Sequence, residues 1–282
     1  MSLSVIILTF NSERTIQATL ESAFRVSDDV HIVDSFSTDQ TLEMVKKYPI
    51  NLVQHEFENY GAQRNWAIAN LPLKYDWEFH LDADERLTCE LVAEINSLKK
   101  DFPAKVDGYF IPRLVHFMGR PMRYGGMFPI WHMRLFKHGG GCCEDREYDQ
   151  HFRVAGVSGR LKGVMIDDIR MSLSDWSARH LRWAEAEVKE LCRGERAGRI
   201  PGNLWGTPVQ KKRSLRDLYN GAPLLLRAFM LFFYRYFLRL GFLCGKEGLI
   251  FFVLQTFWFR FLIDAKLFEA RLERKNDQFL GS

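Results

Sequence analysis

The sequence predicts an α/β fold in which a mostly parallel sheet is flanked by helices. Short apolar, β-branched segments recur through residues 1–90, and each is followed by polar helix-capping residues and a helical stretch. That alternation is typical of βαβ units and of a doubly wound sheet. The chain of 282 residues is long enough for one sizeable α/β domain plus an appendage, and short for two full domains.

Four strands are predicted in the first part of the chain. The first, Leu3–Thr9, reads LSVIILT, a continuous apolar run expected of a strand that is buried on both faces. The other strands are Asp29–Val33, Asn51–His55 and Trp77–Leu81. The helices between them are expected over residues 11–24, Ser37–Tyr48 and Asn59–Asn70.

The pattern changes after residue 101. Frequent Gly and Pro residues between Phe102 and Asp168 predict shorter and more irregular strands. The amphipathic segment Ser174–Cys192 is expected to form a helix, and Gly194–Pro208 is a break in the pattern. Two or more amphipathic, aromatic-rich helices are predicted within Leu215–Leu272.

The predicted domain organisation follows from these changes. A main domain is expected over residues 1–193, with a nucleotide-binding half over 1–100 and an acceptor half over 101–193. A linker over 194–214 and a helical, membrane-associating region over 215–282 complete the chain. Phe, Trp and Tyr make up 14% of all residues, which is a high share, and much of this aromatic excess lies in the last region.

Composition argues against several classes of protein. A net charge of +4 gives no reason to expect nucleic acid as a partner. The five cysteines show no metal-ligand spacing and predict reduced thiols in a cytosolic protein. The N-terminus lacks the features of a signal peptide, and the longest apolar run, Gly248–Phe259, is too short to span a bilayer. We therefore expect a cytoplasmic protein without a membrane-spanning helix.

Two acidic residues, Asp82 and Asp84, follow the apolar segment Trp77–Leu81 with one alanine between them. Carboxylates at the C-terminal end of a strand reach the crevice where α/β sheets bind ligands. Oxygen ligands of this kind suit Mg²⁺ or Mn²⁺, and such an ion neutralises charge on a diphosphate leaving group. A solvated acidic turn is the alternative, but the position after a buried strand favours a metal site.

A second polar cluster lies at the ends of the first two predicted strands. Thr9 and Asn11 follow the first strand, and Asp34 and Asp39 follow the second. Adjacent strand ends line one crevice, where such side chains can hold a base and a ribose by hydrogen bonds. Ser, Thr, Asn and Asp also cap helices, and Asp39 or Ser37 can serve only that purpose.

These motifs resemble family 2 of the inverting glycosyltransferases, which have the GT-A fold, a Rossmann-like α/β arrangement. The resemblance covers residues 1–90 and rests on four segments at family-like spacings, VIILTFN, IVDSFSTDQT, GAQRNWA and LDADE. It implies a nucleotide-sugar donor, with UDP expected, and a divalent cation, Mg²⁺ or Mn²⁺. It also implies that Asp82 and Asp84 hold the metal, with Asp82 beside the donor. The other residues implied to contact the nucleotide or its phosphates are Thr9, Asn11, Asp34, Asp39 and Arg64.

The second half carries a fainter resemblance to bacterial family members that build lipopolysaccharide core or other surface polysaccharide. It rests on WHMRLF, EDREYDQHF and the segment from Ile166 to Glu187. Inverting transfer needs a carboxylate near the acceptor hydroxyl, because that proton must leave as the oxygen attacks the sugar. We expect Asp149 to be this base, with Glu144 and Asp145 as alternatives. His151 is either a metal ligand or a structural imidazole.

The segment Leu224–Phe242 is expected to form a helix that lies on a membrane surface. Arg227, Arg235 and Arg239 fall on one side of a helical wheel, beside a wide aromatic surface. In-plane interfacial helices bury such a surface at the acyl boundary while their arginines meet lipid phosphates. The alternative is packing against the main domain or against a second copy of the chain. We expect a protein that is peripheral to the inner face of the cell membrane.

The leading hypothesis is a metal-dependent hexosyltransferase that moves a sugar from a nucleotide-diphosphate sugar to a lipopolysaccharide core, capsule or other glycan or glycolipid acceptor. A second hypothesis is a polyprenyl-phosphate sugar synthase, whose lipid phosphate acceptor needs little or no base. A third, of another class, is a non-catalytic scaffold docked on the membrane, against which the intact LDADE motif argues. Nucleic acid is not expected as a partner, and a homo-oligomer is left open.

Overall fold

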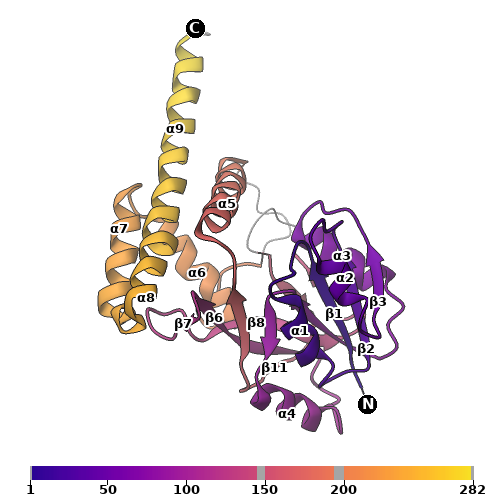
Figure 1. Cartoon of the computed structure of the whole chain (residues 1–282). Helices are drawn as coiled ribbons and strands as arrows, with labels where there is room; N and C mark the ends of the chain where they lie inside the picture. Colours follow the sequence, from indigo (N-terminus) through magenta and orange to yellow (C-terminus); the bar gives the residue numbers. More distant parts are fainter. Residues whose placement is uncertain (1, 145–149, 194–199, 281–282) are drawn as a thin grey trace. The chain divides into compact units, whose positions relative to one another are not determined.

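The computed structural model describes residues 2–144, 150–193 and 200–280. These residues fold into two compact units (Figure 1). Unit 1 consists of Met1–Pro121 and Phe128–Arg170, and unit 2 consists of Met122–Met127 and Met171–Ser282. The domain limits expected at residues 193 and 214 stay predictions, because compactness alone does not assign a role to either part.

A sheet of ten strands is the centre of the described part of unit 1. The strands of unit 1 are β1 Ser4–Thr9, β2 Asp29–Asp34, β3 Asn51–Gln54, β4 Trp77–Asp82, β5 Glu85–Leu87, β6 Gly108–Phe117, β7 Arg120–Pro121, β8 Ile130–Lys137, β9 Gly141–Cys143, β10 Phe152–Val154, β11 Ser158–Arg160 and β12 Met165–Ile169. The order in the sheet is β3-β2-β1-β4-β8-β6-β12-β5, with β7 and β11 also paired to β6, while β9 and β10 pair with each other. The first four strands are parallel, as predicted, whereas β8 runs antiparallel to both β4 and β6.

Helices cover both faces of the parallel part of this sheet. They are α1 Ile16–Ala23, α2 Thr41–Val45, α3 Tyr60–Asn70 and α4 Cys89–Leu98. Val5 and Ile7 of β1 point to the face where α1 and α4 pack, and Ile6 and Leu8 point to the face where Ala67 of α3 packs. The α/β prediction is therefore confirmed, and burial of β1 on both faces explains its unbroken apolar sequence.

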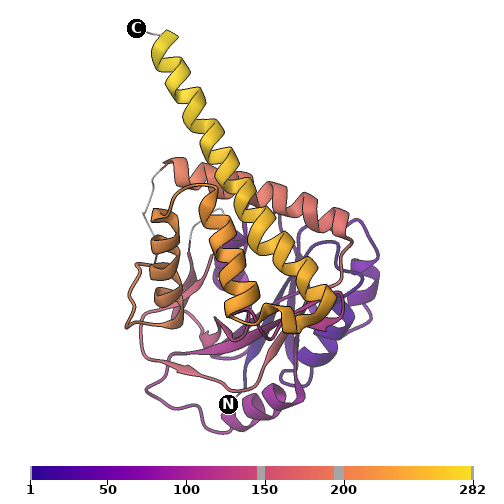
Figure 2. The same cartoon turned by 90° about the vertical axis from the view of Figure 1, so that its left-hand side faces the viewer.

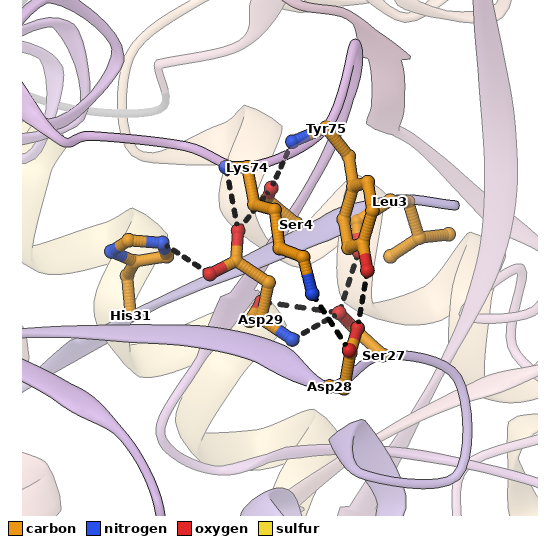
Figure 3. A network of polar contacts seen from close by, with 8 residues as sticks. All are labelled: Leu3, Ser4, Ser27, Asp28, Asp29, His31, Lys74 and Tyr75. Carbon is orange, nitrogen blue, oxygen red and sulfur yellow. Dashed lines mark hydrogen bonds and ion pairs between the residues drawn. The ribbon is translucent and has the colours of Figure 1, made fainter. Parts of the chain in front are cut away.

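A polar network lies at the N-terminal ends of β1 and β2 (Figure 3). Ser4 donates from its hydroxyl to Asp29 and accepts a hydrogen bond from the backbone N–H of Tyr75. Asp29 also accepts from the backbone N–H of Lys74 at 2.9 Å and contacts His31 at 3.0 Å. Burial alone raises the pKa of Asp29, but the hydrogen bonds from Ser4 and Lys74 outweigh burial and lower it. The network ties β1, β2 and the loop before β4 together.

The second half contains both short and long strands, and β7, β9, β10 and β11 are as short as predicted, with two or three residues each. The expectation of short, irregular strands is wrong for β6, which has ten residues, and for β8, which has eight. Pro112 suggested a break, yet it lies between the part of β6 paired with β11 and the part paired with β12. Proline has no backbone N–H to donate, and this is tolerated at a position that neither of the parallel strands β11 and β12 pairs with.

Unit 2 is mainly helical in its described residues. Its elements are α5 Leu173–Arg193, α6 Pro208–Gly221, α7 Leu226–Phe233, the π-helical turn η1 Tyr234–Leu238, the 3₁₀ turn η2 Gly241–Cys244, α8 Gly245–Phe252, the π-helical turn η3 Val253–Trp258 and α9 Phe259–Leu280. The helix expected over Ser174–Cys192 is confirmed as α5. Figure 2 shows α9 as a long helix that continues to the end of the described residues. The start of α6 lies within the expected linker, where Thr207 and Gln210 form a capping box.

Buried ion pairs hold the helices of unit 2 together. Arg227 of α7 donates to Asp264 of α9 at 2.8 Å, and both side chains are almost completely buried. Glu187 of α5 accepts from Arg260 of α9 at 3.0 Å and from Arg216 of α6. Arg227 therefore does not belong to the basic edge that the helical wheel predicted for a membrane surface.

One helical stretch in the described residues, Gly241–Glu273, is long and apolar enough to cross a membrane by length and composition alone. The expectation of no such helix was based on the shorter run Gly248–Phe259, which the structure extends by continuous helical turns. The stretch carries Arg260 and Asp264, both engaged in the ion pairs of the bundle, and part of it is buried within the protein. Packing against polar groups of unit 2 fits a bundle helix.

Candidate functional site

The ends of β1, β2 and β4 lie side by side in unit 1. Thr9 pairs with Asp34 in the parallel register of β1 and β2, and Leu8 pairs with Asp82 in the register of β1 and β4. The acidic triplet that begins at Asp82 therefore lies next to the polar ends of the first two strands. This is the edge at which open α/β sheets bind ligands.

The loops that follow β1 and β2 are joined by hydrogen bonds. The side-chain oxygen of Asn11 accepts from the backbone N–H of Thr38 at 2.8 Å, and the N–H of Asn11 donates to the hydroxyl of Ser37 at 2.9 Å. Asp39 accepts from the N–H of Glu13 at 3.1 Å. Burial raises the pKa of Asp39, but the hydrogen bonds from Thr41 and Glu13 lower it overall. The two loops thus act as one wall of the site.

Asp34 and Thr9 lie at the floor between these loops. The Asp34 carboxylate is fully buried and accepts hydrogen bonds from the N–H of Ser37 at 2.9 Å and from the amide of Gln54 at 3.0 Å. Thr9 is also buried, and within the described chain its hydroxyl has no hydrogen-bond partner. A buried polar atom without a partner is costly, so the Thr9 hydroxyl is a natural contact for a bound ligand.

Arg64 reaches the site from α3. Asn59 caps this helix by accepting from the N–H of Ala62 at 2.9 Å. Arg64 is almost completely buried, and its guanidinium donates to both oxygens of Asp82 at 2.8 and 3.1 Å. Arg64 was expected near the nucleotide or its phosphates, and in the structure it lies against the first residue of the acidic triplet.

Arg134 of β8 is a second buried arginine at Asp82. Its guanidinium donates to Asp82 at 2.7 Å and to Glu85 at 2.6 Å. Glu85 also accepts from the backbone N–H of Asp82 at 2.9 Å. Glu85 was not among the site residues expected from the sequence. Its signal was the acidic residue that ends LDADE, one position after Asp84.

The charges around Asp82 shift its pKa and that of its neighbour in opposite directions. Burial raises the pKa of Asp82, but Arg134 and Arg64 outweigh burial and hold it well below its usual range. Burial raises the pKa of Glu85 to about 7, against the effect of Arg134. Asp82 is therefore ionised near neutral pH.

The donor set suits a hard cation that also takes ligands from its substrate. Asp82 is partly exposed, and Asp84 is partly exposed beside it. Within the described residues no group of three or more His, Cys, Asp or Glu side chains could hold a metal ion without further ligands. Mg²⁺ is commonly bound by one or two carboxylates together with substrate phosphates, so the pair fits such an ion.

The three candidate bases lie within residues 144–149, of which the structure describes only Glu144. Asp145 and Asp149 lie outside the described residues. Glu144 is completely buried and accepts from the N–H of His151 at 3.0 Å, while the N–H of Glu144 donates back to the carbonyl of His151. The His151 ring lies 3.4 Å from the same carboxylate and is nearly parallel to that of His132. Glu144 and His151 thus join the two ends of the segment.

The sequence profile described as glycosyl transferase family 2 matches residues 4–136 of this chain. An uncharacterized glycosyltransferase of Rickettsia bellii is 33% identical over 93 residues, which cover 33% of this chain and 31% of that protein. An uncharacterized protein of Mycobacterium tuberculosis is 26% identical over 188 residues, covering 59% of this chain and 44% of that protein. The matches thus span about a third of the first relative and under half of the second.

Two solved structures show a distant likeness. S. aureus TarS 1-349 in complex with UDP-GlcNAc matches with a TM-score of 0.44 and 14% identity, covering 96% of this chain and 92% of that one. Glucosyl-3-phosphoglycerate synthase from Mycobacterium tuberculosis, in complex with Mn²⁺, UDP-glucose and phosphoglyceric acid, matches with a TM-score of 0.33 and 17% identity, covering 41% and 44%. The site described above rests on the geometry of this chain alone.

Proposed function

We propose that this chain, whose residues 4–136 match the model of glycosyl transferase family 2, is a metal-dependent inverting hexosyltransferase that uses a nucleotide-diphosphate sugar. UDP is the nucleotide we expect, and a lipopolysaccharide core, capsule or other glycan is the acceptor. One observation carries this proposal, namely that Thr9, Asp34 and Asp82 end three adjacent parallel strands. A nucleotide and a cation can then share one crevice.

The chain's own residues divide the work of donor binding. Thr9 offers to the base or ribose a buried hydroxyl that has no hydrogen-bond partner among the described residues. Asp34 and Asp39 hold the loops in which Asn11 lies, so that the nucleotide meets a preformed wall. Preformed polar walls lower the cost of ordering the site when the ligand binds.

Asp82 and Asp84 are the proposed ligands of the divalent cation. A bound Mg²⁺ or Mn²⁺ would supply positive charge that stabilises the departing diphosphate. Arg64 and Arg134 hold the Asp82 carboxylate ionised and in place from two sides. Arg64 also brings positive charge to the region in which the donor phosphates would lie.

Asp149 is the proposed base that accepts the proton of the acceptor hydroxyl. Of its two alternatives, Asp145 lies in the same segment, and Glu144 is enclosed by its contacts with His151. A buried carboxylate is a poor choice for a group that must meet an incoming acceptor. The assignment thus rests on sequence position and on the enclosure of Glu144.

Donor hydrolysis tests the proposal most directly. Nucleotide-sugar panels with Mg²⁺ or Mn²⁺ should show slow, cation-dependent release of the nucleotide diphosphate, which is lost in Asp82→Asn and Asp84→Asn. A titration with UDP and Mn²⁺ that shows no binding by the wild-type chain would instead support a non-catalytic scaffold. This outcome would exclude the proposed transferase.

A polyprenyl-phosphate sugar synthase is the second candidate, favoured by the many exposed aromatic side chains of unit 2. A lipid phosphate acceptor is already ionised and needs little or no base. Asp149→Ala should abolish transfer to a glycan hydroxyl, whereas near-full activity of this variant would support the lipid phosphate acceptor. In both cases we propose a cytoplasmic protein that is peripheral to the inner face of the cell membrane.

A further inference from the structure

Arg235 has an environment that is unusual for a guanidinium group. It lies in η1 of unit 2 and is partly buried. Its Nη1 donates to the sulfur of Met127 at 3.1 Å, and no carboxylate of the described residues lies within ion-pair distance. A thioether sulfur is a weak acceptor and carries no charge. The positive charge of Arg235 is therefore not compensated within the described chain.

Two more arginines add positive charge to the same place. Burial lowers the pKa of Arg235 to about 10, and Arg260 and Arg239 lower it in the same direction. Arg260 is paired with Glu187, whereas Arg239 is exposed and donates to the hydroxyl of Tyr234 at 3.1 Å. Arg239 thus has a neutral partner, and an anion could bind to both Arg235 and Arg239.

The segment Met122–Met127 contacts both Arg235 and Arg239 on one side of unit 2. The N–H of Gly125 donates to the carbonyl of Arg239 at 2.8 Å, and Met127 contacts Arg235. A Cβ atom added at Gly126 would lie 3.9 Å from the Arg239 guanidinium. The segment therefore contacts both side chains.

The surroundings of this pair are apolar and exposed. We call residues 226–243 the aromatic segment, because it presents many large hydrophobic side chains to solvent. Those next to the arginines in sequence are Phe233, Tyr234, Phe237, Leu238, Leu240 and Phe242. Soluble proteins rarely leave so many such side chains exposed without a partner. A ligand that carries a phosphate on an apolar body matches both features.

We propose that Arg235 and Arg239 bind the phosphate of an anionic membrane lipid, while the aromatic segment lies at the acyl boundary of the bilayer. The proposal rests on the membrane location proposed above. Arg227, which the helical wheel grouped with these two, is excluded because Asp264 neutralises it. The basic edge of this surface therefore consists of Arg235 and Arg239.

Vesicle flotation with the full chain tests this site without any nucleotide. The wild-type chain should float with vesicles of phosphatidylcholine mixed with phosphatidylglycerol, and less with phosphatidylcholine alone. Arg235→Gln and Arg239→Gln should each weaken binding to the anionic vesicles about fivefold, as expected for one basic residue near a charged bilayer. Arg271→Gln removes the same charge from an exposed position of α9 and should change binding less than about twofold.

Thermal unfolding separates a binding role from a structural one. Because Arg235 makes no ion pair within the described residues, Arg235→Gln should unfold at the same temperature as the wild type or higher. If this variant fails to fold, Arg235→Lys, which keeps the charge but not the planar fork, should retain part of the preference for anionic vesicles. A folded Arg235→Lys variant with no preference for anionic vesicles would count against the proposal.

Several outcomes would overturn the proposal. Equal losses in Arg271→Gln and Arg235→Gln would indicate a general charge effect. The site would bind free phosphate and not a lipid if inorganic phosphate raised the unfolding temperature of the wild-type chain while the chain did not bind vesicles. A dimer in light scattering that does not bind vesicles would indicate that a second copy covers the aromatic segment. UDP and Mn²⁺ titrations of the wild-type chain report the proposed transferase function separately.

Discussion

Asp82 is the residue at which buried charges of unit 1 meet. Arg64 arrives from α3 and Arg134 from β8, and both donate to the same carboxylate. The place of Asp82 beside Thr9 could be predicted, because parallel strands bring their C-terminal ends to one edge of a sheet. The partnership with Arg134 could not, because it depends on an antiparallel strand that follows much later in the chain.

Arg134→Met should strongly destabilise unit 1. The variant removes the guanidinium that bridges two buried carboxylates, so Asp82 keeps only Arg64 and Glu85 loses its closest positive partner. We expect a loss of about 3 kcal/mol in the free energy of unfolding, measured by urea denaturation. Adding Glu85→Gln should recover part of this loss, because it removes the buried carboxylate that lost its closest guanidinium. A loss below about 1 kcal/mol in Arg134→Met would show that Arg134 is not needed to balance the buried carboxylates.

Glu78 is a buried acid on the same face of β4. Neither of its oxygens has a hydrogen-bond partner within the described chain, and the ring of His80 lies 3.4 Å away. Burial raises the pKa of Glu78 to about 8, and burial also holds the pKa of His80 well below its usual range. Both side chains are therefore neutral near pH 7, and their contact is not an ion pair.

The free energy of unfolding should fall as the pH rises from 4.5 to about 8, the range over which the pKa of Glu78 is shifted. The folded chain keeps a proton that the unfolded chain loses near pH 4.5, so the stabilising protonated form is fully present below that pH. It is lost as the pH rises through about 8. Glu78→Gln should flatten this dependence, with each unit of pKa shift worth about 1.4 kcal/mol. Urea unfolding at a series of pH values checks it, and identical slopes in both proteins would refute it.

At the scale of elements, periodicity predicted the four parallel strands and the helix α5, because each has an uninterrupted pattern. The length of β6 was missed, since Pro112 and the glycines around it mimic a loop in sequence. The π-helical turns η1 and η3 were also missed. Such turns depend on packing against neighbouring helices and leave no mark in a hydrophobic pattern.

The packing of Met122–Met127 against α8 depends on one glycine. A Cβ atom at Gly125 would lie 2.0 Å from the Phe252 ring, and the φ angle of +70° disfavours other residues. Gly125→Ala should therefore destabilise unit 2 by about 1–3 kcal/mol. Gly119→Ala is the matched control, because it has a φ of +78° but no atom within 4 Å of the added carbon. Equal unfolding temperatures of the two variants would show that the clash is relieved.

At the scale of the whole molecule, the chain contains two compact units with different kinds of internal support. Unit 1 depends on a sheet with a buried apolar core, and unit 2 on helices joined by buried ion pairs. Composition predicted the aromatic excess of the second part. It could not predict which arginines are paired, because Arg227 and Arg235 lie in the same kind of sequence.

The two units should respond differently to donor nucleotide. UDP with Mn²⁺ binds only the folded site of unit 1, so it should raise the unfolding temperature of that unit by several degrees at saturating concentrations, about 2–4 °C for each kcal/mol of binding free energy. Scanning calorimetry of the full chain should show a shift of one transition and not the other. The shift should vanish in Asp82→Asn, and a shift that persists there would place the nucleotide elsewhere.

The hydrogen bonds of Ser4 and Asp29 lie far along the strands from the proposed donor site, yet they constrain it (Figure 3). Strand residues alternate between faces, so slipping β1 by one position would turn the side chain at every position to the opposite face. A single-residue deletion between Ser4 and Thr9 would thus exchange core and site residues together. The anchoring of β1 at its beginning decides which side chain is presented at its end.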